Sequence, residues 1–515
     1  MRAVPTTTND LYPDCPAAPI VADLIGQLHQ DLVNTEVEET RPCGPAVIHL
    51  IREASSFLVQ CTSTQIPFTS NLVSREHVIA SLDHLFALAD ENINAIEFNL
   101  VQSCWLRLYT DVSLLRSLLD LVVGPDGEGK ERIFWLRAVR RLDMAIIVAG
   151  AVGVGRMDWI QRTIKEIQKT GLRRRRSAGE GGEGASRRSS KRRCIAKDAS
   201  ESTDETLLFA PSRIAVLRQA PSVSQYLQHH ITSPFILKRH LDSPDSPCPP
   251  WPAVDRWRSA EYLLDLVGEG RVVPVEVGGA YDEKDWGQRI IPFRDFLARA
   301  GYQVSVEDDG EDKDEREKRR LVEGDVPEVE PPLYLAQHPL LKQFPELDSD
   351  ISLPDYVWSS PPEPVATPSY RPPENEDGLL LNVWVGSGKG EIISPAHTDP
   401  YYNCYAQVLG RKRVWLAPPA VSTHMYAYGL SPIKDHSTDS LTTQYITNTS
   451  TVPILRPAFD LAQIKEKHPS FYEHVWPVSL EAVLEPGDMM IMPPGWWHAM
   501  RGEGEGVGWS VSMWY

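Results

Sequence analysis

The spacing of apolar residues divides the chain into two parts of different character. Between residues 18 and 170, apolar side chains recur at helical spacing, and the run Gly124–Gly127 ends one such series, formed by Leu108, Val112, Leu115, Leu119 and Val122. Ser74 stands before a further stretch of this kind, in the position of a helix N-cap. The pattern predicts an α-helical domain over residues 1–170, built as a bundle or as an array of helical hairpins.

From residue 206 onward the pattern changes to short apolar runs separated by Gly and Pro turns. The predicted strands are Val272–Val277, Leu379–Val385, Tyr405–Leu409, Arg413–Leu416, Asp488–Met492 and Trp509–Trp514. Asp285–Ala300 is predicted as one amphipathic helix. Many short strands with turns between them indicate an antiparallel barrel or jelly roll, so the expected fold class is α+β.

Three segments have compositions that do not build a core. Residues 171–205 carry basic clusters at Arg173–Arg176, Arg187–Arg188 and Lys191–Arg193, separated by Gly, Ser and Glu, and are predicted to form a flexible linker. The clusters favour a nuclear-import signal over a merely solvated linker or a nucleic-acid contact. A charged stretch at 306–331 and a Pro-rich stretch at 358–377 are predicted as disordered inserts in a catalytic domain that spans 206–515.

Composition narrows the classes of protein further. The chain has 515 residues and a formal net charge of −18, which argues against a protein that coats nucleic acid and suits a basic partner, although solubility alone also explains such a charge. Its seven cysteines are odd in number and form no Cys-x-x-Cys, which indicates a reducing compartment. The N-terminus lacks an apolar signal segment, and the longest apolar stretch, Met144–Gly155, is too short to span a bilayer.

The strongest chemical signal is a split trio of metal-binding side chains. His397 and Asp399 stand two apart, which places them on the same face of a strand, and His498 follows in a distant strand after Pro493–Gly495. Two histidines and one carboxylate form the facial triad that binds Fe(II) and leaves three positions open. The trio therefore predicts an oxygenase, in which these residues are both metal ligands and the catalytic centre.

Lys412 adds a second component to this prediction. It lies on the strand that follows His397 and Asp399. An iron oxygenase that uses 2-oxoglutarate must bind the far carboxylate of that acid, and a lysine does so by a charge-assisted hydrogen bond. An exposed strand lysine is the alternative interpretation.

These motifs resemble the core of the JmjC-domain oxygenases. The resemblance rests on His397–Asn403 and Gln407–Lys412, and it continues through upstream blocks in the same order, at Trp251–Pro252, Pro274–Gly278, Tyr334–His338, Pro345–Leu347, Asp350–Tyr356 and Asn382–Gly386. It covers about residues 245–515, whereas the helical half matches only in general character. The family implies a double-stranded β-helix, related to the cupins, that binds Fe(II) and uses 2-oxoglutarate and O₂ as co-substrates.

The resemblance also implies roles for individual residues. His397, Asp399 and His498 would be the iron ligands, while Tyr334, Ser394, Asn403 and Lys412 would contact 2-oxoglutarate. Glu276 and Trp384 fall where the family recognises a basic side chain; a strand-edge charge and a core tryptophan are the alternative interpretations. The two inserts depart from the family pattern next to the substrate groove, so the resemblance does not identify the substrate.

Several functions remain open at this point. The first is oxidation of a basic protein or peptide, such as a histone tail, by hydroxylation of Arg or Lys or by demethylation of methyl-lysine. Ion pairing and stacking by Glu276 and Trp384 favour hydroxylation of a guanidinium-bearing residue. The alternatives are a non-catalytic chromatin reader or scaffold and a cupin enzyme that uses another metal. The expected location is the nucleus, with the cytoplasm also open, and the helical half is expected to bind a protein partner.

Overall fold

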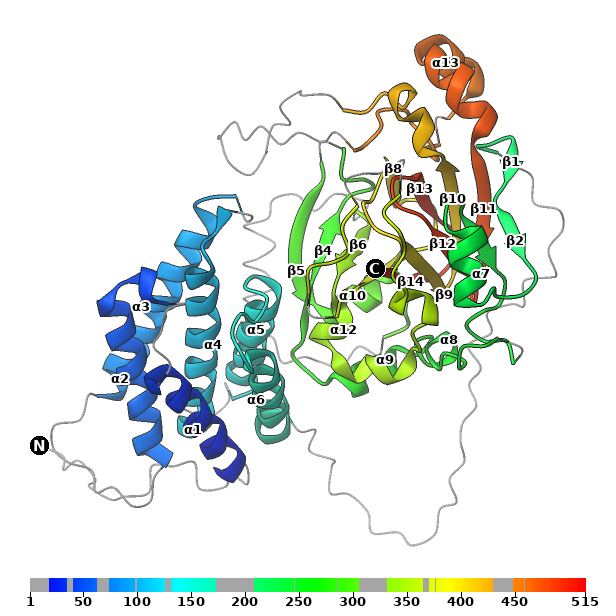
Figure 1. The fold of residues 1–515 in the computed structure, drawn as a ribbon. Helices are drawn as coiled ribbons and strands as arrows, with labels where there is room; N and C mark the ends of the chain where they lie inside the picture. The colour runs from blue at the N-terminus through cyan, green and yellow to red at the C-terminus, as the bar shows by residue number, and fades with distance from the viewer. Residues whose placement is uncertain are drawn as a thin grey trace, which may run out of the picture.

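The computed structural model describes residues 18–34, 40–62, 74–97, 100–125, 131–172, 208–244, 246–283, 285–304, 331–364, 370–375, 377–428, 448–457 and 459–515. The predicted basic linker, apart from residues 171 and 172, and the charged insert, apart from residue 331, lie outside these ranges. The described residues form a helical part and a β-rich part, which lie side by side (Figure 1).

The helical part matches the predicted α-helical domain. Its helices are α1 (Ala18–Asn34), α2 (Pro45–Thr62), α3 (Arg75–Asn94), α4 (Ser103–Val123), α5 (Glu131–Ile147) and α6 (Arg156–Gly171). The Ser74 side chain accepts a hydrogen bond from the His77 N–H, which confirms the predicted N-cap. Helix α4 is buried on nearly all sides because it packs against α3, α5, α2 and α6. In the part of the chain that the structure describes, no helix is long and apolar enough to cross a membrane.

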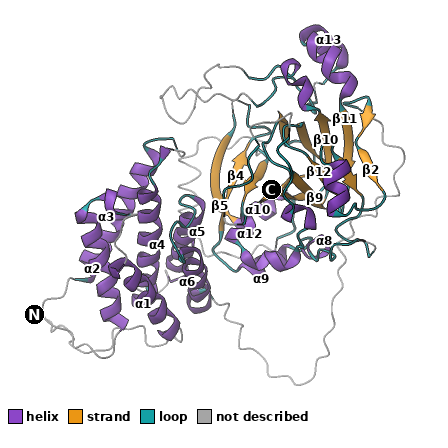
Figure 2. Ribbon diagram, viewed as in Figure 1, coloured by secondary structure: helices purple, strands orange, loops and turns teal. Residues whose placement is uncertain are grey.

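The β-rich part consists of two sheets, as Figure 2 shows. The smaller sheet has the order β1-β11-β10-β13-β8, and the larger has the order β2-β3-β12-β9-β14-β7-β6-β4-β5. Apart from the short parallel pairs β1–β11 and β2–β3, the pairings of the described strands are antiparallel. The arrangement confirms the predicted α+β class with a cupin-like β-domain.

The strand bounds follow the predicted runs closely. The strands are β1 (Ser212–Arg213), β2 (Ala215–Leu217), β3 (Phe235–Leu237), β4 (Val272–Val277), β5 (Gly287–Pro292), β6 (Leu333–His338), β7 (Leu380–Ser387), β8 (Ile393–His397), β9 (Asn403–Leu409), β10 (Arg411–Ala417), β11 (Leu480–Leu484), β12 (Met489–Met492), β13 (Trp497–Glu503) and β14 (Val507–Trp514). The accompanying helices are α7 (Val223–Gln225), α8 (Ala253–Arg256), α9 (Ala260–Val267), α10 (Phe293–Ala300), α12 (Leu340–Gln343) and α13 (Leu461–Lys467).

Apolar packing closes both faces of each sheet. Between the sheets lies a small core with members from β9, β10, β12 and β13, including Tyr405, Val414, Leu416, Met490 and Met500. The outer face of the larger sheet carries the largest core, which includes residues of α8, α9, α10 and α12. The outer face of the smaller sheet is covered by the segment around α13. The space between the sheets at one end of the barrel therefore remains for a site.

Two predicted segments differ in the structure. The single helix predicted at Asp285–Ala300 is wrong in its first half: Gly287–Pro292 is the edge strand β5, and the helix begins only at Phe293. Pro292 ends the strand, and pairing of β5 with β4 outweighs the helical periodicity. Within the Pro-rich stretch at 358–377, Tyr370 is buried and its ring packs edge-on against Tyr402, so this described residue belongs to the core.

Candidate metal centre

Three predicted ligands meet at the junction of β8 and β13. His397 ends β8, Asp399 follows two residues later, and His498 lies in β13 directly opposite His397 in the antiparallel pairing. Their ligand atoms all lie within 4.8 Å of one another. The Asp399 carboxylate is 3.4 Å from His498 Nε2 and 4.0 Å from His397 Nε2. Strand pairing thus assembles a trio that the sequence keeps far apart.

Both histidines present the same ring nitrogen to the common point. His397 Nδ1 donates to the backbone carbonyl of Pro395 at 2.8 Å, and His498 Nδ1 donates to that of Trp496 at 3.0 Å. Each Nδ1–H is therefore held by the chain, and each Nε2 faces Asp399. Metal-binding histidines are ordinarily oriented in this way.

The charge states suit metal binding as well. Burial, with a further contribution from His498, lowers the pKa of His397 to about 4, so this ring is neutral near pH 7. Burial acts to raise the pKa of Asp399, but the hydrogen bond and charge of His498 and the charge of His397 outweigh it and bring the pKa below its ordinary value. A neutral imidazole and an ionised carboxylate are the forms that bind a divalent cation.

The donor set fits an iron of the facial-triad type. Two imidazole nitrogens and one carboxylate oxygen converge from one side, and the cavity beside them leaves room for further ligands. His397 and Asp399 line this cavity, while His498, with 3% of its surface exposed, closes the site from behind.

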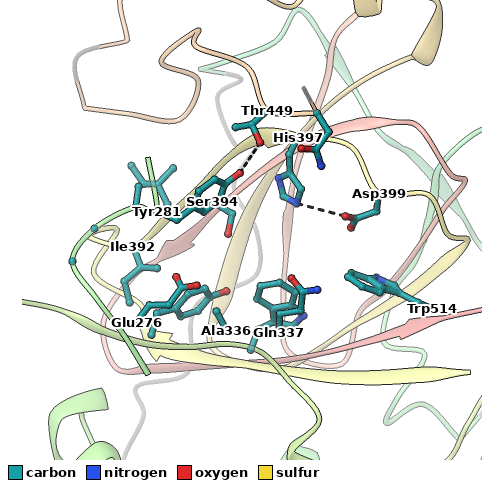
Figure 3. Close-up of a pocket in the computed structure, with 17 residues that line it drawn as sticks. Glu276, Tyr281, Ala336, Gln337, Ile392, Ser394, His397, Asp399, Thr449 and Trp514 are labelled. Atoms are coloured by element: carbon teal, nitrogen blue, oxygen red, sulfur yellow. Dashed lines mark hydrogen bonds and ion pairs between the residues drawn. The ribbon is translucent and has the colours of Figure 1, made fainter. Parts of the chain in front are cut away.

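A cavity of about 370 Å³ opens in front of the trio. Figure 3 shows side chains from several segments around it. His397 and Asp399 lie close together, and Glu276 and Trp514 lie at separate places on the lining. Its lining residues are Glu276, Gly278, Gly279, Ala280, Tyr281, Tyr334, Ala336, Gln337, Trp384, Ile392, Ile393, Ser394, His397, Asp399, Asn448, Thr449 and Trp514. A volume of this size accommodates a small acid together with one side chain of a substrate.

Lys412 reaches the cavity wall from β10. Its Nζ donates to the Tyr334 hydroxyl at 3.3 Å, and among the described residues no carboxylate pairs with this ammonium group. Burial lowers the pKa of Lys412 to about 8. A buried cation without a countercharge is costly, so the site is chemically suited to an anionic ligand.

Of the other three predicted contacts of 2-oxoglutarate, two line the cavity and one does not. Tyr334 and Ser394 both line the cavity. Burial raises the pKa of Tyr334 well above its ordinary value, and a hydrogen bond with Ser394 offsets only part of this rise. Asn403 is buried at the start of β9 and does not line the cavity, but its Oδ1 has no hydrogen-bond partner among the described residues. Of the four polar groups predicted to contact 2-oxoglutarate, Lys412 bonds Tyr334 directly, and Ser394 lines the same cavity as Tyr334.

Glu276 in β4 and Trp384 in β7 face the cavity from the two strands that flank β6. Burial raises the pKa of Glu276, and the nearby Trp286 side chain opposes this shift. The rings of Trp384 and Tyr334 pack with their centroids 6.0 Å apart. The Trp384 indole N–H donates to the Ser512 hydroxyl at 3.0 Å. An acid and an aromatic ring therefore stand in one cavity with the metal ligands.

Sequence reasoning missed several lining residues. The Tyr281 hydroxyl bonds the Thr449 hydroxyl at 3.2 Å, and Thr449 forms a β-bridge with His397 (Figure 3). Gln337 lies in a bulge of β6, and Trp514 lies near the end of β14. None of these residues forms a spacing motif with the trio. Of them, only Gln337 lies in a block of the family resemblance, Tyr334–His338.

Comparison with known proteins agrees with this geometry. The sequence model of the family described as "Cupin-like domain" matches residues 230–515. Jumonji C domain-containing protein 5 of Drosophila melanogaster is 32% identical over 52% of this chain and 52% of its own length. Lysine-specific demethylase 8 of Danio rerio is 32% identical over 52% of this chain and 50% of its own length. Lysine-specific demethylase JMJ30 of Arabidopsis thaliana is 31% identical over 52% of this chain and 47% of its own length.

These relatives confirm the resemblance to JmjC proteins. The chain spans about half the length of the curated relatives it matches. The matched half corresponds to the part that holds the cavity and the three ligands.

Proposed function

The chain belongs to the cupin-like domain family, in its JmjC branch, and from this premise we propose that it is an Fe(II)- and 2-oxoglutarate-dependent oxygenase of protein side chains. His397, Asp399 and His498 would hold the ferrous ion, because their donors converge and the lowered pKa values of His397 and Asp399 keep that ring neutral and that carboxylate ionised near pH 7. The bound iron, 2-oxoglutarate and O₂ would supply the oxidising chemistry, and the chain would bind, orient and shield the reactants.

The observation that carries this proposal is the buried ammonium group of Lys412. Its Nζ lies against the Tyr334 hydroxyl, and the described residues offer it no carboxylate. A dicarboxylic acid with one end at the metal would supply the missing countercharge with its other end. Tyr334 and Ser394 would add neutral hydrogen bonds, and Asn403, with its free Oδ1, is proposed to take part in the same contact.

We propose a basic side chain of a protein or peptide, such as a histone tail, as the substrate. The carboxylate of Glu276 and the ring of Trp384 line the same cavity as the metal ligands. A planar guanidinium pairs with a carboxylate and stacks on an aromatic ring, which favours hydroxylation of arginine over demethylation of methyl-lysine. Four of the relatives are named as lysine-specific demethylases, so demethylation remains the competing reaction.

The test separates these reactions by mass. The full chain is loaded with Fe(II) without oxygen, supplied with 2-oxoglutarate and arginine- or methyl-lysine-containing peptides, and then exposed to O₂. A gain of one oxygen indicates hydroxylation, and loss of one methyl group indicates demethylation. Succinate formation that depends on the peptide supports the oxygenase proposal, with His397→Ala as the inactive control. Absence of succinate with every basic peptide argues for a binding protein instead, and turnover without 2-oxoglutarate argues for a different cupin reaction.

A nuclear role is proposed on the basic clusters at Arg173–Arg176 and Lys191–Arg193. The expected result is that the tagged full chain concentrates in the nucleus and that neutralising both clusters disperses it. Nuclear accumulation that persists after neutralisation contradicts this assignment.

A further inference from the structure

The helical part and the β-part are joined by a buried polar chain that starts at Asp143 of α5. The Asp143 carboxylate accepts from Arg271 Nε at 3.0 Å and from Arg271 Nη2 at 2.8 Å. It also accepts from the backbone N–H of Val272, the first residue of β4, at 2.9 Å. The two charged side chains are 0% and 2% exposed, so the pair lies in the interior of the molecule.

Gln343, at the end of α12, is the next member of this chain. Its backbone carbonyl accepts from Arg271 Nη2 at 2.7 Å and from Gln161 Nε2 of α6 at 2.9 Å. Its own side-chain Nε2 donates to the carbonyl of Val272 at 2.8 Å, and its Oε1 accepts from His338 Nε2 at 2.6 Å. One fully buried residue therefore connects α6 directly, and α5 through Arg271, with β4 and β6.

His338 directly follows a β-bulge in the cavity wall. Leu335 pairs with Val385 and His338 pairs with Val383, so two residues of β6, Ala336 and Gln337, oppose the single residue Trp384 of β7. Ala336, Gln337 and Trp384 all line the cavity.

The backbone at this bulge is strained. Gln337 has φ of +48°, a left-handed conformation that a side chain other than Gly rarely adopts. Such a conformation persists where the surrounding contacts hold it. His338, the residue that follows Gln337, is held by its hydrogen bond to Gln343.

The helices approach the β-part closely at the same place. The turn before β4 contains Gly268 (φ +75°) and Gly270 (φ +83°). A Cβ on Gly268 would lie 2.4 Å from the Gln168 side chain of α6, and one on Gly270 would lie 3.1 Å from Leu136 of α5. Figure 1 shows α5 and α6 as the helices of the bundle that face the β-part. This fit leaves little freedom for the helices to move relative to β4.

We propose that the helical part is a positioning element of the candidate site. Through Asp143, Arg271, Gln343 and His338, helices α5 and α6 hold the β6 bulge so that Gln337 faces the cavity opposite Trp384. These four residues are positioning residues, since none of them lines the cavity. The role adds to the expected binding of a partner by the helical part, and it does not depend on the reaction proposed above.

The test uses the full chain with Gln343→Leu, which removes the side-chain bonds to His338 and Val272, and with Asp143→Asn, which removes the countercharge of Arg271 from the helical side at unchanged side-chain size. Lys165→Ala and Arg132→Ala are matched controls, because their partners Glu346 and Glu269 also lie across the interface but outside the polar chain. The primary readout is hydrogen–deuterium exchange of residues 333–338, compared with that of α1–α4 in the same molecule.

Both test variants should raise exchange in residues 333–338 by about tenfold or more, with α1–α4 and both controls unchanged. Unchanged exchange in β6, or an equal rise throughout the chain, would overturn the proposal, because the polar chain would then only add general stability. If Gln343→Leu does not fold, Asp143→Asn decides by the same criterion.

A second readout applies where the oxygenase reaction is observed. In both test variants the ratio of oxidised peptide to succinate should fall, because a displaced cavity wall positions the peptide less well. The exchange experiment stands without this assay, so a failure of the proposed reaction is distinguishable from a failure of the positioning proposal.

Discussion

His498 Nε2 lies 3.4 Å from Asp399 Oδ2, although the two residues come from segments far apart in the sequence. The pairing of β13 with β8 brings them together, since it places His498 opposite His397. Each histidine is also locked by its Nδ1 on a backbone carbonyl two residues earlier. The chain therefore orients its metal donors before any metal binds, which lowers the cost of forming the site.

Removal of one donor should abolish tight metal binding without unfolding the chain. We expect His498→Ala to weaken binding of Mn(II), an O₂-stable substitute for Fe(II), by at least about 100-fold, because loss of even an outer-shell partner costs 10- to 100-fold. Titration calorimetry measures the affinity, and circular dichroism checks the fold. His424→Ala is the matched control, since His424 stacks on His474 and lies outside the cavity lining. Equal Mn(II) affinity in the two variants would contradict the assignment.

Binding of 2-oxoglutarate should depend on the charge of Lys412. Lys412→Met removes a charge-assisted hydrogen bond and should weaken 2-oxoglutarate binding by about 10- to 100-fold, with little change in Mn(II) affinity. Lys389→Met, at an exposed lysine, serves as the control. Calorimetry of the Mn(II)-loaded protein gives both constants, and an unchanged 2-oxoglutarate affinity refutes the role of Lys412.

The pH dependence of this binding follows from the depressed pKa of Lys412. Burial lowers that pKa to about 8, and only the protonated amine attracts a carboxylate. As the pH rises above 8, the fraction of ammonium falls, so the 2-oxoglutarate affinity should fall with it, approaching about tenfold per pH unit. The neighbouring Tyr334 has a pKa well above its ordinary value and stays neutral over this range. Lys412→Met should lose this dependence, and a wild-type affinity that is flat from pH 7 to 10 would be inconsistent with it.

The sequence predicts local patterns well and long-range pairings poorly. The strand Val272–Val277 is found with its predicted bounds, because the apolar pattern of a strand can be recognised from consecutive residues. The ligand trio was predicted because two of its members are two residues apart and a family motif supplies the third. The first case rests on local spacing, and the second on local spacing together with the family motif.

The missed features depend on partners far away in the chain. Asp143 and Arg271 are charged, and charged residues are expected at the surface, yet these two form a buried pair between two parts of the molecule. Thr449 has no motif, and only its bridge to His397 brings it to the cavity. The edge strand β5 was predicted as helix because its pairing partner, not its own periodicity, decides its conformation.

Asp350 should be important for the stability of the β-part. Its buried carboxylate accepts from Trp257 Nε1 at 2.9 Å and from the Tyr262 hydroxyl at 2.8 Å. Asp350→Ala leaves the buried indole N–H without its acceptor and should lower the free energy of unfolding by about 3 kcal/mol. The exposed pair Arg162–Asp23 provides the control, since Arg162→Ala should cost less than about 1 kcal/mol. Urea unfolding followed by tryptophan fluorescence compares them, and equal midpoints would argue against a central role for Asp350.

The charge of Glu276 should select basic substrates. Glu276 lies in the cavity with Trp384, and its burial raises its pKa, so an incoming cation would stabilise the ionised form. Glu276→Gln keeps the size of the side chain but removes the charge, and we expect it to lower kcat/KM for an arginine peptide by about 10- to 100-fold. Binding of 2-oxoglutarate should stay unchanged, because its proposed contacts lie at Lys412 and Tyr334. Glu283→Gln is the control, since the Glu283 carboxylate is paired with Arg456 at 2.7 Å and does not line the cavity. An equal loss in both variants would mean that general negative charge near the cavity, rather than the carboxylate inside it, attracts the peptide.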